Sequence, residues 1–126
     1  MITQNFAASF AKHWIAAWNS HDIDEILSHY HENFSMNSPV IVSAMQEESG
    51  RLVGKKSVKK YWLKALTNYP ELTFTLLHTM VGASSITLIY QGVRGLSAET
   101  FVFDGEKVIE AFAHYEQALQ PALKTT

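Results

Sequence analysis

The periodicity of apolar residues is mostly helical in the first part of this 126-residue chain and mostly strand-like in the last part, and that order limits the folds open to it. Before residue 70, three segments repeat apolar residues at helical spacing. After residue 72, apolar and polar residues mostly alternate, as they do in strands. Helices followed by consecutive strands favour the α+β class, in which helices pack on one face of an antiparallel sheet. No repeat or linker divides the chain, so we expect one domain over residues 1–126 with an ordered core of about 3–117.

The strongest helical pattern spans about residues 3–19. Its large aromatic residues recur at every fourth position and form one apolar stripe: Phe6, Phe10, Trp14 and Trp18. A second, shorter helix is predicted after Asp22, because its carboxylate can cap the first turn and Glu25 follows three residues later, as in a capping box. A third helix is predicted between Gly54 and Pro70, and we interpret its five lysines as a solvated face.

Strand signals begin in residues 31–42, where alternation predicts a short strand that ends near Pro39. The polar segment 44–53 contains Gly50 and is interpreted as a loop. Four further strands are predicted near residues 72–81, 85–91, 96–103 and 107–116. The pair Asp104-Gly105 predicts a hairpin turn between the last two strands, and the tail from Gln117 is expected to be loose.

The composition excludes several functional classes. The chain has no cysteine, which excludes disulfides, thiolate zinc sites and thiol nucleophiles, and its net charge of −2 argues against a nucleic-acid partner. Apolar runs stop short of the roughly 20 residues that a membrane span needs, and no signal peptide is evident, so we expect a cytoplasmic protein without a membrane partner. His29 and His31 lack a third ligand and no phosphate-binding glycine loop occurs, so we expect neither a metal nor a cofactor.

Four segments resemble, in the same order along nearly the whole chain, the SnoaL-like and nuclear-transport-factor-2-like proteins. They are residues 14–24 (WIAAWNSHDID), 38–40 (SPV), 54–62 (Gly54, Val58 and Tyr61-Trp62) and 101–108 (FVFDGEKV). The resemblance implies a cone-shaped, curved antiparallel sheet of the cystatin-like α+β type, with three helices closing a pocket. The family includes steroid isomerases, polyketide cyclases and epoxide hydrolases, together with non-catalytic modules, so the fold alone leaves the function open.

The resemblance also allows catalytic patterns to be carried over position by position. The isomerase branch uses a tyrosine, an aspartate base and a second acid, whose places are taken here by Trp14, Ser38 and Glu99. Serine is no carbon base near neutral pH and indole donates more weakly than phenol, so the resemblance does not imply steroid isomerisation. The hydrolase and cyclase patterns need an acid on the last strand, where the matching inward positions include Ala111 and Ala113. Glu99 is the acid that remains.

Alternation along residues 96–103 places Glu99 on the same strand face as Phe101 and Phe103, and hence in the interior. Burial raises the pKa of a carboxyl group, which is how enzymes tune general acids and bases. Two alternatives stay open at this point: Glu99 reaches water at the end of its strand, or it pairs with a neighbour such as Arg94.

Ligand contacts are expected mainly from aromatic side chains with polar tips. The predicted ligand-binding set is Trp14, Trp18, Ser38, Trp62, Leu88, Tyr90, Phe101, Ala113 and Tyr115. One hypothesis is an enzyme that acts on a small hydrophobic carbonyl or polyketide-like compound, with Glu99 as acid or base and Tyr90 or Tyr115 as donors. The alternative is a non-catalytic ligand-binding or dimerisation module with the same pocket.

A homodimer is expected because Phe112 and alternate apolar side chains would otherwise lie exposed on the outer face of the sheet. His114 shares that face by alternation, so we place it at the interface and not in the pocket. A bulge in the last strand would reverse this assignment.

Overall fold

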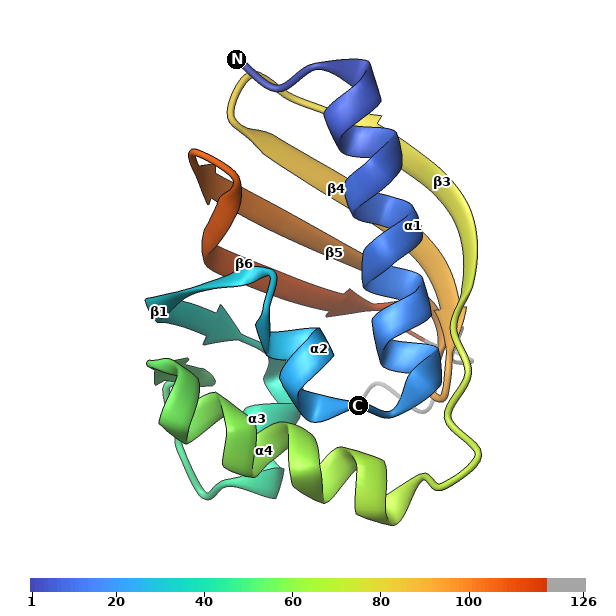
Figure 1. Cartoon of the computed structure of the whole chain (residues 1–126). Helices are drawn as coiled ribbons and strands as arrows, with labels where there is room; N and C mark the ends of the chain where they lie inside the picture. Colours follow the sequence, from blue (N-terminus) through green and yellow to red (C-terminus); the bar gives the residue numbers. More distant parts are fainter. Residues whose placement is uncertain (118–126) are drawn as a thin grey trace, which may run out of the picture.

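The computed structural model describes residues 1–117, which form a curved six-stranded sheet and four helices (Figure 1). The helices are α1 (Gln4–Ser20), α2 (Ile23–Leu27), α3 (Pro39–Ala44) and α4 (Lys55–Asn68). The strands are β1 (Tyr30–Asn37), β2 (Arg51–Val53), β3 (Thr75–Val81), β4 (Ser85–Gly92), β5 (Gly95–Asp104) and β6 (Lys107–Tyr115). The expected α+β class is confirmed.

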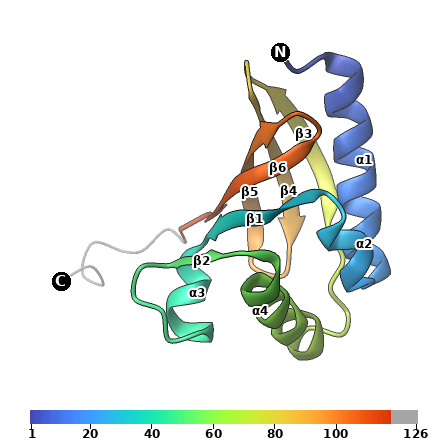
Figure 2. The ribbon, with the colours of Figure 1, turned by 60° about the vertical axis from the view of Figure 1, so that its left-hand side comes forward.

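The strand order is β2-β1-β6-β5-β4-β3, and neighbouring strands are antiparallel apart from β1, which runs parallel to β6. No hairpin joins β1 to β6, so their direction is free of the constraint that a tight turn imposes. Register shifts in β1, β3 and along β5–β6 bend the sheet, as bulges do. Figure 2 shows α1 beside β3 and β4, and α4 below β1 and β2.

Helix α1 confirms the helix predicted for residues 3–19. The hydroxyl of Thr3 accepts a hydrogen bond of 3.0 Å from the backbone N–H of Phe6, and His21 ends the helix in a left-handed conformation with φ of 62°. The aromatic stripe faces the sheet, where Phe10 packs edge-on against Phe101 with 4.9 Å between ring centroids. This helix therefore contributes buried residues to the core along most of its length.

The segment after β1 differs from the prediction. The strand ends at Asn37, close to the predicted end near Pro39, but residues 39–44 then form a helix that was not predicted, because Ser38 caps α3 through a 3.2 Å hydrogen bond from Val40 N–H and Pro39 occupies the first helical turn. Proline has a fixed φ that suits this position as well as a strand end, so the sequence signal was ambiguous. The expected loop 44–53 also contains a short strand, β2.

The last hairpin also differs in detail. Asp104 pairs with Lys107 within the ladder, so the two turn residues are Gly105 and Glu106, and Gly105 supplies the positive φ of 64°. No helix within residues 1–117 is long and apolar enough to cross a membrane. The tail that was expected to be loose lies outside the described residues after Gln117.

Candidate ligand-binding and acid–base site

A cavity of about 190 Å³ lies between the helices and the inner face of the sheet. Buried side chains form its deep part, among them Trp14, Trp62, Tyr90, Ser97 and Glu99. Exposed side chains from the end of α4 and from the β4–β5 turn form its mouth: Lys64, Asn68, Tyr69, Val93 and Arg94. The cavity is therefore deep and aromatic, and it opens toward solvent at one end of the sheet.

Tightly packed rings hold the walls of the cavity in place. The ring of Trp18 lies 5.2 Å from that of Trp62 and 5.4 Å from that of Phe74, measured between centroids. Trp14 packs edge-on against Tyr90 at 5.3 Å. Each such pair contributes about 0.5–1.5 kcal/mol beyond the burial of area, so the walls of the cavity are rigid and mostly apolar.

Glu99 is the acidic residue of this cavity, and only 4% of it is exposed. Desolvation raises its pKa to about 7, while a hydrogen bond of 3.0 Å from the Tyr90 hydroxyl to Oε1 acts in the opposite direction. Glu99 forms no ion pair with any residue in 1–117, so the alternative of pairing with Arg94 is wrong. A carboxyl group with this pKa is present in both protonation states near neutral pH, as acid–base chemistry requires.

Two phenol groups meet at Ser38 near the cavity. The Tyr61 hydroxyl donates a 3.5 Å hydrogen bond to Ser38 Oγ, and Ser38 also lies near enough to the Tyr115 phenol to lower its pKa against the larger effect of burial. Burial raises the pKa of both phenols, and the charge of Glu99 raises them further, so both stay protonated and can donate. Arg94 lies over the Tyr115 ring, with Cζ 5.8 Å from the ring centroid.

In the isomerase pattern, Trp14 takes the place of a tyrosine and Ser38 the place of an aspartate base. Neither side chain presents a hydrogen-bonding or basic group to the cavity. The Trp14 indole N–H donates to the Tyr30 hydroxyl at 2.9 Å and is therefore already satisfied within the core. Ser38 caps α3 and receives the Tyr61 hydroxyl, and it is not among the residues that line the cavity.

The structure brings six of the predicted site residues to the cavity wall, namely Trp14, Trp18, Trp62, Tyr90, Glu99 and Tyr115. It leaves four away from it: Ser38, Leu88, Phe101 and Ala113. Leu88 and Phe101 are on the correct face of the sheet, but both are fully buried, and Phe101 packs against Phe10 of α1. Ala113 pairs with Glu99 across β5 and β6, and its methyl group is too short to reach past that neighbour.

Sequence reasoning missed Tyr61, Phe74 and the mouth of the cavity. Tyr61 precedes Trp62 in a helix already predicted to be amphipathic, so helical spacing could have suggested it. Arg94 had no such signal, because only the folded chain brings the β4–β5 turn to the end of α4. His114 is exposed on the outer face, and residues 1–117 contain no group of three potential metal ligands.

The sequence model of the SnoaL-like domain matches residues 11–116. The chain belongs to the SnoaL-like family. A SnoaL-like protein of unknown function from Burkholderia thailandensis is 47% identical, with 92% of this chain and 98% of that chain covered and a TM-score of 0.89. The cone-shaped fold expected from the resemblance is therefore confirmed for this SnoaL-like chain.

More distant structures share the SnoaL-like fold alone. A candidate ketosteroid isomerase from Kribbella flavida is 13% identical, with 93% of this chain and 82% of that chain covered and a TM-score of 0.72. AclR, a candidate hydroxylase from Streptomyces galilaeus, is 15% identical, with 90% and 91% covered and a TM-score of 0.70. None of the curated proteins compared with this SnoaL-like chain matches it.

Proposed function

We propose that this SnoaL-like protein binds a small hydrophobic carbonyl compound in its cavity and that Glu99 transfers a proton on that compound, as isomerases and cyclases do. The observation that carries the proposal is one buried carboxyl group, with a pKa of about 7, in a cavity whose other deep residues are mostly aromatic. A base of this strength, shielded from water, can remove a proton from a carbon next to a carbonyl group.

The proposed proton transfer needs only groups that this chain supplies. The ionised Glu99 takes a proton from the carbon next to the carbonyl, the C–H bond breaks, and its electron pair forms the enolate. Protonated Glu99 then returns the proton to carbon, at the same position or at a conjugated one. The Tyr90 hydroxyl holds Oε1 at 3.0 Å, which leaves Oε2 as the oxygen that exchanges the proton. Donors at the cavity wall, such as Tyr115, stabilise the enolate oxygen.

Deuterium exchange tests this step without knowledge of the natural substrate. The protein is incubated in D₂O with phenylacetone, a one-ring ketone, and incorporation of deuterium next to the carbonyl is followed by mass spectrometry. The wild-type protein should accelerate exchange, and Glu99→Gln should abolish the acceleration. Glu110→Gln is the matched control, because Glu110 is the carboxylate of the neighbouring strand and is absent from the cavity wall. Equal rates for wild type and Glu99→Gln would overturn the proposal.

The alternative function is a non-catalytic binding module, and the small size of the cavity favours it, since three tryptophans and Tyr115 leave only about 190 Å³. If the protein binds a ligand but shows no Glu99-dependent deuterium exchange on any ketone, the binding module is the correct alternative.

We also propose that the protein is a cytoplasmic homodimer that associates through the outer face of the sheet. Phe112 is half-buried there in the single chain, among the other outward side chains of β5 and β6. Light scattering at micromolar concentration should give twice the mass of one chain, and Phe112→Asp should halve it. A wild-type mass of one chain would contradict the dimer. Cell fractionation tests the location.

A further inference from the structure

Glu99 and Tyr115 lie on neighbouring strands and on the same inner face of the sheet. In the register of β5 and β6, Tyr115 is opposite Ser97, and Glu99, two residues further along β5, is opposite Ala113. Diagonal neighbours of this kind are roughly 7–8 Å apart. Both Glu99 and Tyr115 line the cavity, and their direct partners have side chains too small to fill the space between them. A carbonyl group and the carbon next to it therefore fit between the carboxyl group and the phenol.

Ser38 leaves the hydrogen of the Tyr115 hydroxyl available. Ser38 Oγ accepts from the backbone N–H of Val40 at 3.2 Å and from the Tyr61 hydroxyl at 3.5 Å. A hydroxyl oxygen has two lone pairs, so Ser38 has a hydrogen left to donate and no lone pair left to accept with. Ser38 lies close to the Tyr115 phenol, where it can donate to the phenol oxygen. The phenol hydrogen therefore remains for another acceptor.

The Tyr115 hydroxyl is also accessible. No acceptor for its hydrogen lies within residues 1–117, yet its oxygen is absent from the side-chain polar atoms that are buried there without a partner. Tyr115 is only half-buried, and it lines the cavity. The Tyr90 hydroxyl, by contrast, is already donated to Glu99 at 3.0 Å. Tyr115 is therefore the phenol beside Glu99 that can donate to a ligand.

The charges around the cavity favour an uncharged ligand. Glu99 is the only acidic residue among the lining residues, and it forms no ion pair within residues 1–117. An anion beside an ionised Glu99 would be repelled, and the repulsion is strong in a buried cavity. A cation would pair with Glu99 and suppress its basicity, and it would first have to pass the exposed Lys64 and Arg94 at the mouth. A neutral molecule meets neither obstacle.

The volume of the cavity fits about one ring. An apolar cavity of roughly 150 Å³ holds benzene, and the cavity here measures about 190 Å³. Its aromatic walls are packed against one another, with Trp18 between Trp62 and Phe74. A fused-ring compound would have to displace these rings, which a closely packed interior resists.

We propose that the substrate is a neutral ketone with one aromatic ring, whose carbonyl oxygen accepts from the Tyr115 hydroxyl while the carbon next to the carbonyl faces Glu99. This inference rests on the proposed function, since it names the substrate class of the same site and how the substrate lies in it. Tyr115 is then the specificity-determining residue, because it recognises the carbonyl and thereby sets which carbon meets Glu99.

Four probes test the charge and the size of the ligand by titration of ¹⁵N-labelled protein. Phenylacetone is the neutral one-ring ketone, phenylacetate and phenylacetamidine are an anion and a cation of the same shape, and 1-(2-naphthyl)propan-2-one has a fused ring. Phenylacetone should bind about tenfold or more tightly than each of the other three. An ion or a fused-ring ketone that binds as tightly as phenylacetone would overturn the proposed substrate class.

Tyr115→Phe tests the recognition of the carbonyl, because it removes the hydroxyl and keeps the ring. It should weaken binding of phenylacetone about three- to tenfold and leave isobutylbenzene, which has the same shape without the oxygen, within about twofold. Thr87→Val removes a hydroxyl from the outer face of the sheet and is the matched control, which should change neither affinity. Equal losses for the two probes in Tyr115→Phe, or no loss, would overturn the role of Tyr115.

Phenylacetone labelled with ¹³C at the carbonyl carbon reports the hydrogen bond directly, because donation to the oxygen moves this signal downfield. The signal bound to the wild-type protein should lie downfield of the signal bound to Tyr115→Phe. If Tyr115→Phe fails to fold, the reference is phenylacetone in hexane, and a wild-type signal at the hexane position would overturn the proposal.

Failure of this inference differs from failure of the proposed function. Glu99-dependent deuterium exchange without a Tyr115-dependent carbonyl signal would overturn the inference and leave the proton transfer standing. A Tyr115-dependent signal without Glu99-dependent exchange would overturn the proton transfer and leave the recognition of ketones standing. No binding of phenylacetone would overturn the inference.

Discussion

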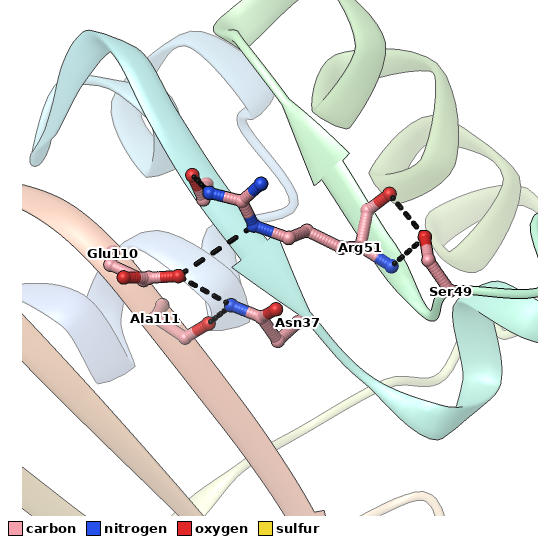
Figure 3. A network of polar contacts seen from close by, with 6 residues as sticks. Asn37, Ser49, Arg51, Glu110 and Ala111 are labelled. Atoms are coloured by element: carbon pink, nitrogen blue, oxygen red, sulfur yellow. Dashed lines mark hydrogen bonds and ion pairs between the residues drawn. The ribbon is translucent and has the colours of Figure 1, made fainter.

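Two carboxylates on neighbouring strands of the sheet have opposite surroundings. Glu99 of β5 points into the cone, where it accepts one hydrogen bond from Tyr90 and has no cationic partner. Glu110 of β6 points outward, where Oε2 lies 3.7 Å from Arg51 Nε and accepts a 3.2 Å hydrogen bond from Asn37 (Figure 3). The charge of Glu110 is therefore balanced by a nearby cation, whereas that of an ionised Glu99 is not.

The outer network joins the strands at one end of the sheet. Arg51 of β2 also donates to Ser35 of β1 at 2.8 Å, and Asn37 also donates to the backbone carbonyl of Ala111 on β6 at 3.1 Å. These contacts tie β2, β1 and β6 together where the parallel pairing occurs. Glu110 therefore contributes to structure, whereas an ionised Glu99 costs stability, as expected for the acid–base role that we propose for it.

The largest expected effect is the pH dependence of stability that Glu99 imposes. Its pKa is about 7 in the folded protein and near the ordinary 4.5 when unfolded, so its favourable contribution is complete below pH 4.5 and is lost as the pH rises through 7. The loss amounts to about 3 kcal/mol. Glu99→Gln should abolish this trend and stabilise the protein at pH 8, as measured by urea unfolding at both pH values. Glu110→Gln should retain the trend, and a flat wild-type profile would contradict the prediction.

The next largest effect is a difference in stability: loss of a buried hydrogen bond should cost more free energy of unfolding than loss of one on the outer face of the sheet. Tyr30→Phe keeps the ring and leaves the buried Trp14 N–H without its 2.9 Å acceptor, so it should cost about 1–3 kcal/mol. Thr87→Val removes a 2.8 Å hydrogen bond to Thr100 on the outer face, where both residues are half-buried and water can replace the lost partner. Its cost should stay within about 0.5 kcal/mol. Similar unfolding free energies for the two variants in chemical denaturation would remove the contrast between the faces.

The variant Tyr90→Phe tests which contacts determine the pKa of Glu99. The Tyr90 hydroxyl lowers the pKa of Glu99 against the larger effect of desolvation, so its removal should move the pKa upward from about 7. The change should correspond to about 1 kcal/mol, the usual contribution of one hydrogen bond. Carboxyl-detected NMR titration measures it. A downward change would mean that water enters the cavity and solvates Glu99.

The smallest effect is expected from the outer ion pair. Arg51 and Glu110 have side chains 49% and 33% exposed, so solvent and salt screen their attraction. Arg51→Gln should therefore cost less than about 1 kcal/mol, and the difference from wild type should shrink in 1 M NaCl. Thermal unfolding at low and high salt tests this. A cost that is large and independent of salt would show that the Ser35 hydrogen bond, and not charge, carries the contact.

Much of the architecture follows from local patterns in the sequence. The four-residue aromatic stripe predicted α1 and the face it buries, because every fourth residue of a helix lies on one side. Alternation in β5 predicted that Glu99 lies inside with Phe101 and Phe103, because successive side chains of a strand point to opposite faces. The pKa direction expected for Glu99 followed from that placement alone.

Other features depend on contacts between distant segments. Local signals at Ser38-Pro39 suit both a strand end and a helix start, so α3 was missed, and β2 was missed because its three residues are too few to show an alternating pattern. Leu88 and Glu99 pair across β4 and β5 on one face, but only the tertiary packing decides that Glu99 reaches the cavity and Leu88 does not. Trp14 and Trp18 are equivalent in the sequence pattern, yet Tyr30 satisfies the indole of Trp14 and nothing in residues 1–117 satisfies that of Trp18. Periodicity determines the face of a side chain, whereas its depth and its partners are set by whatever the tertiary structure packs against it.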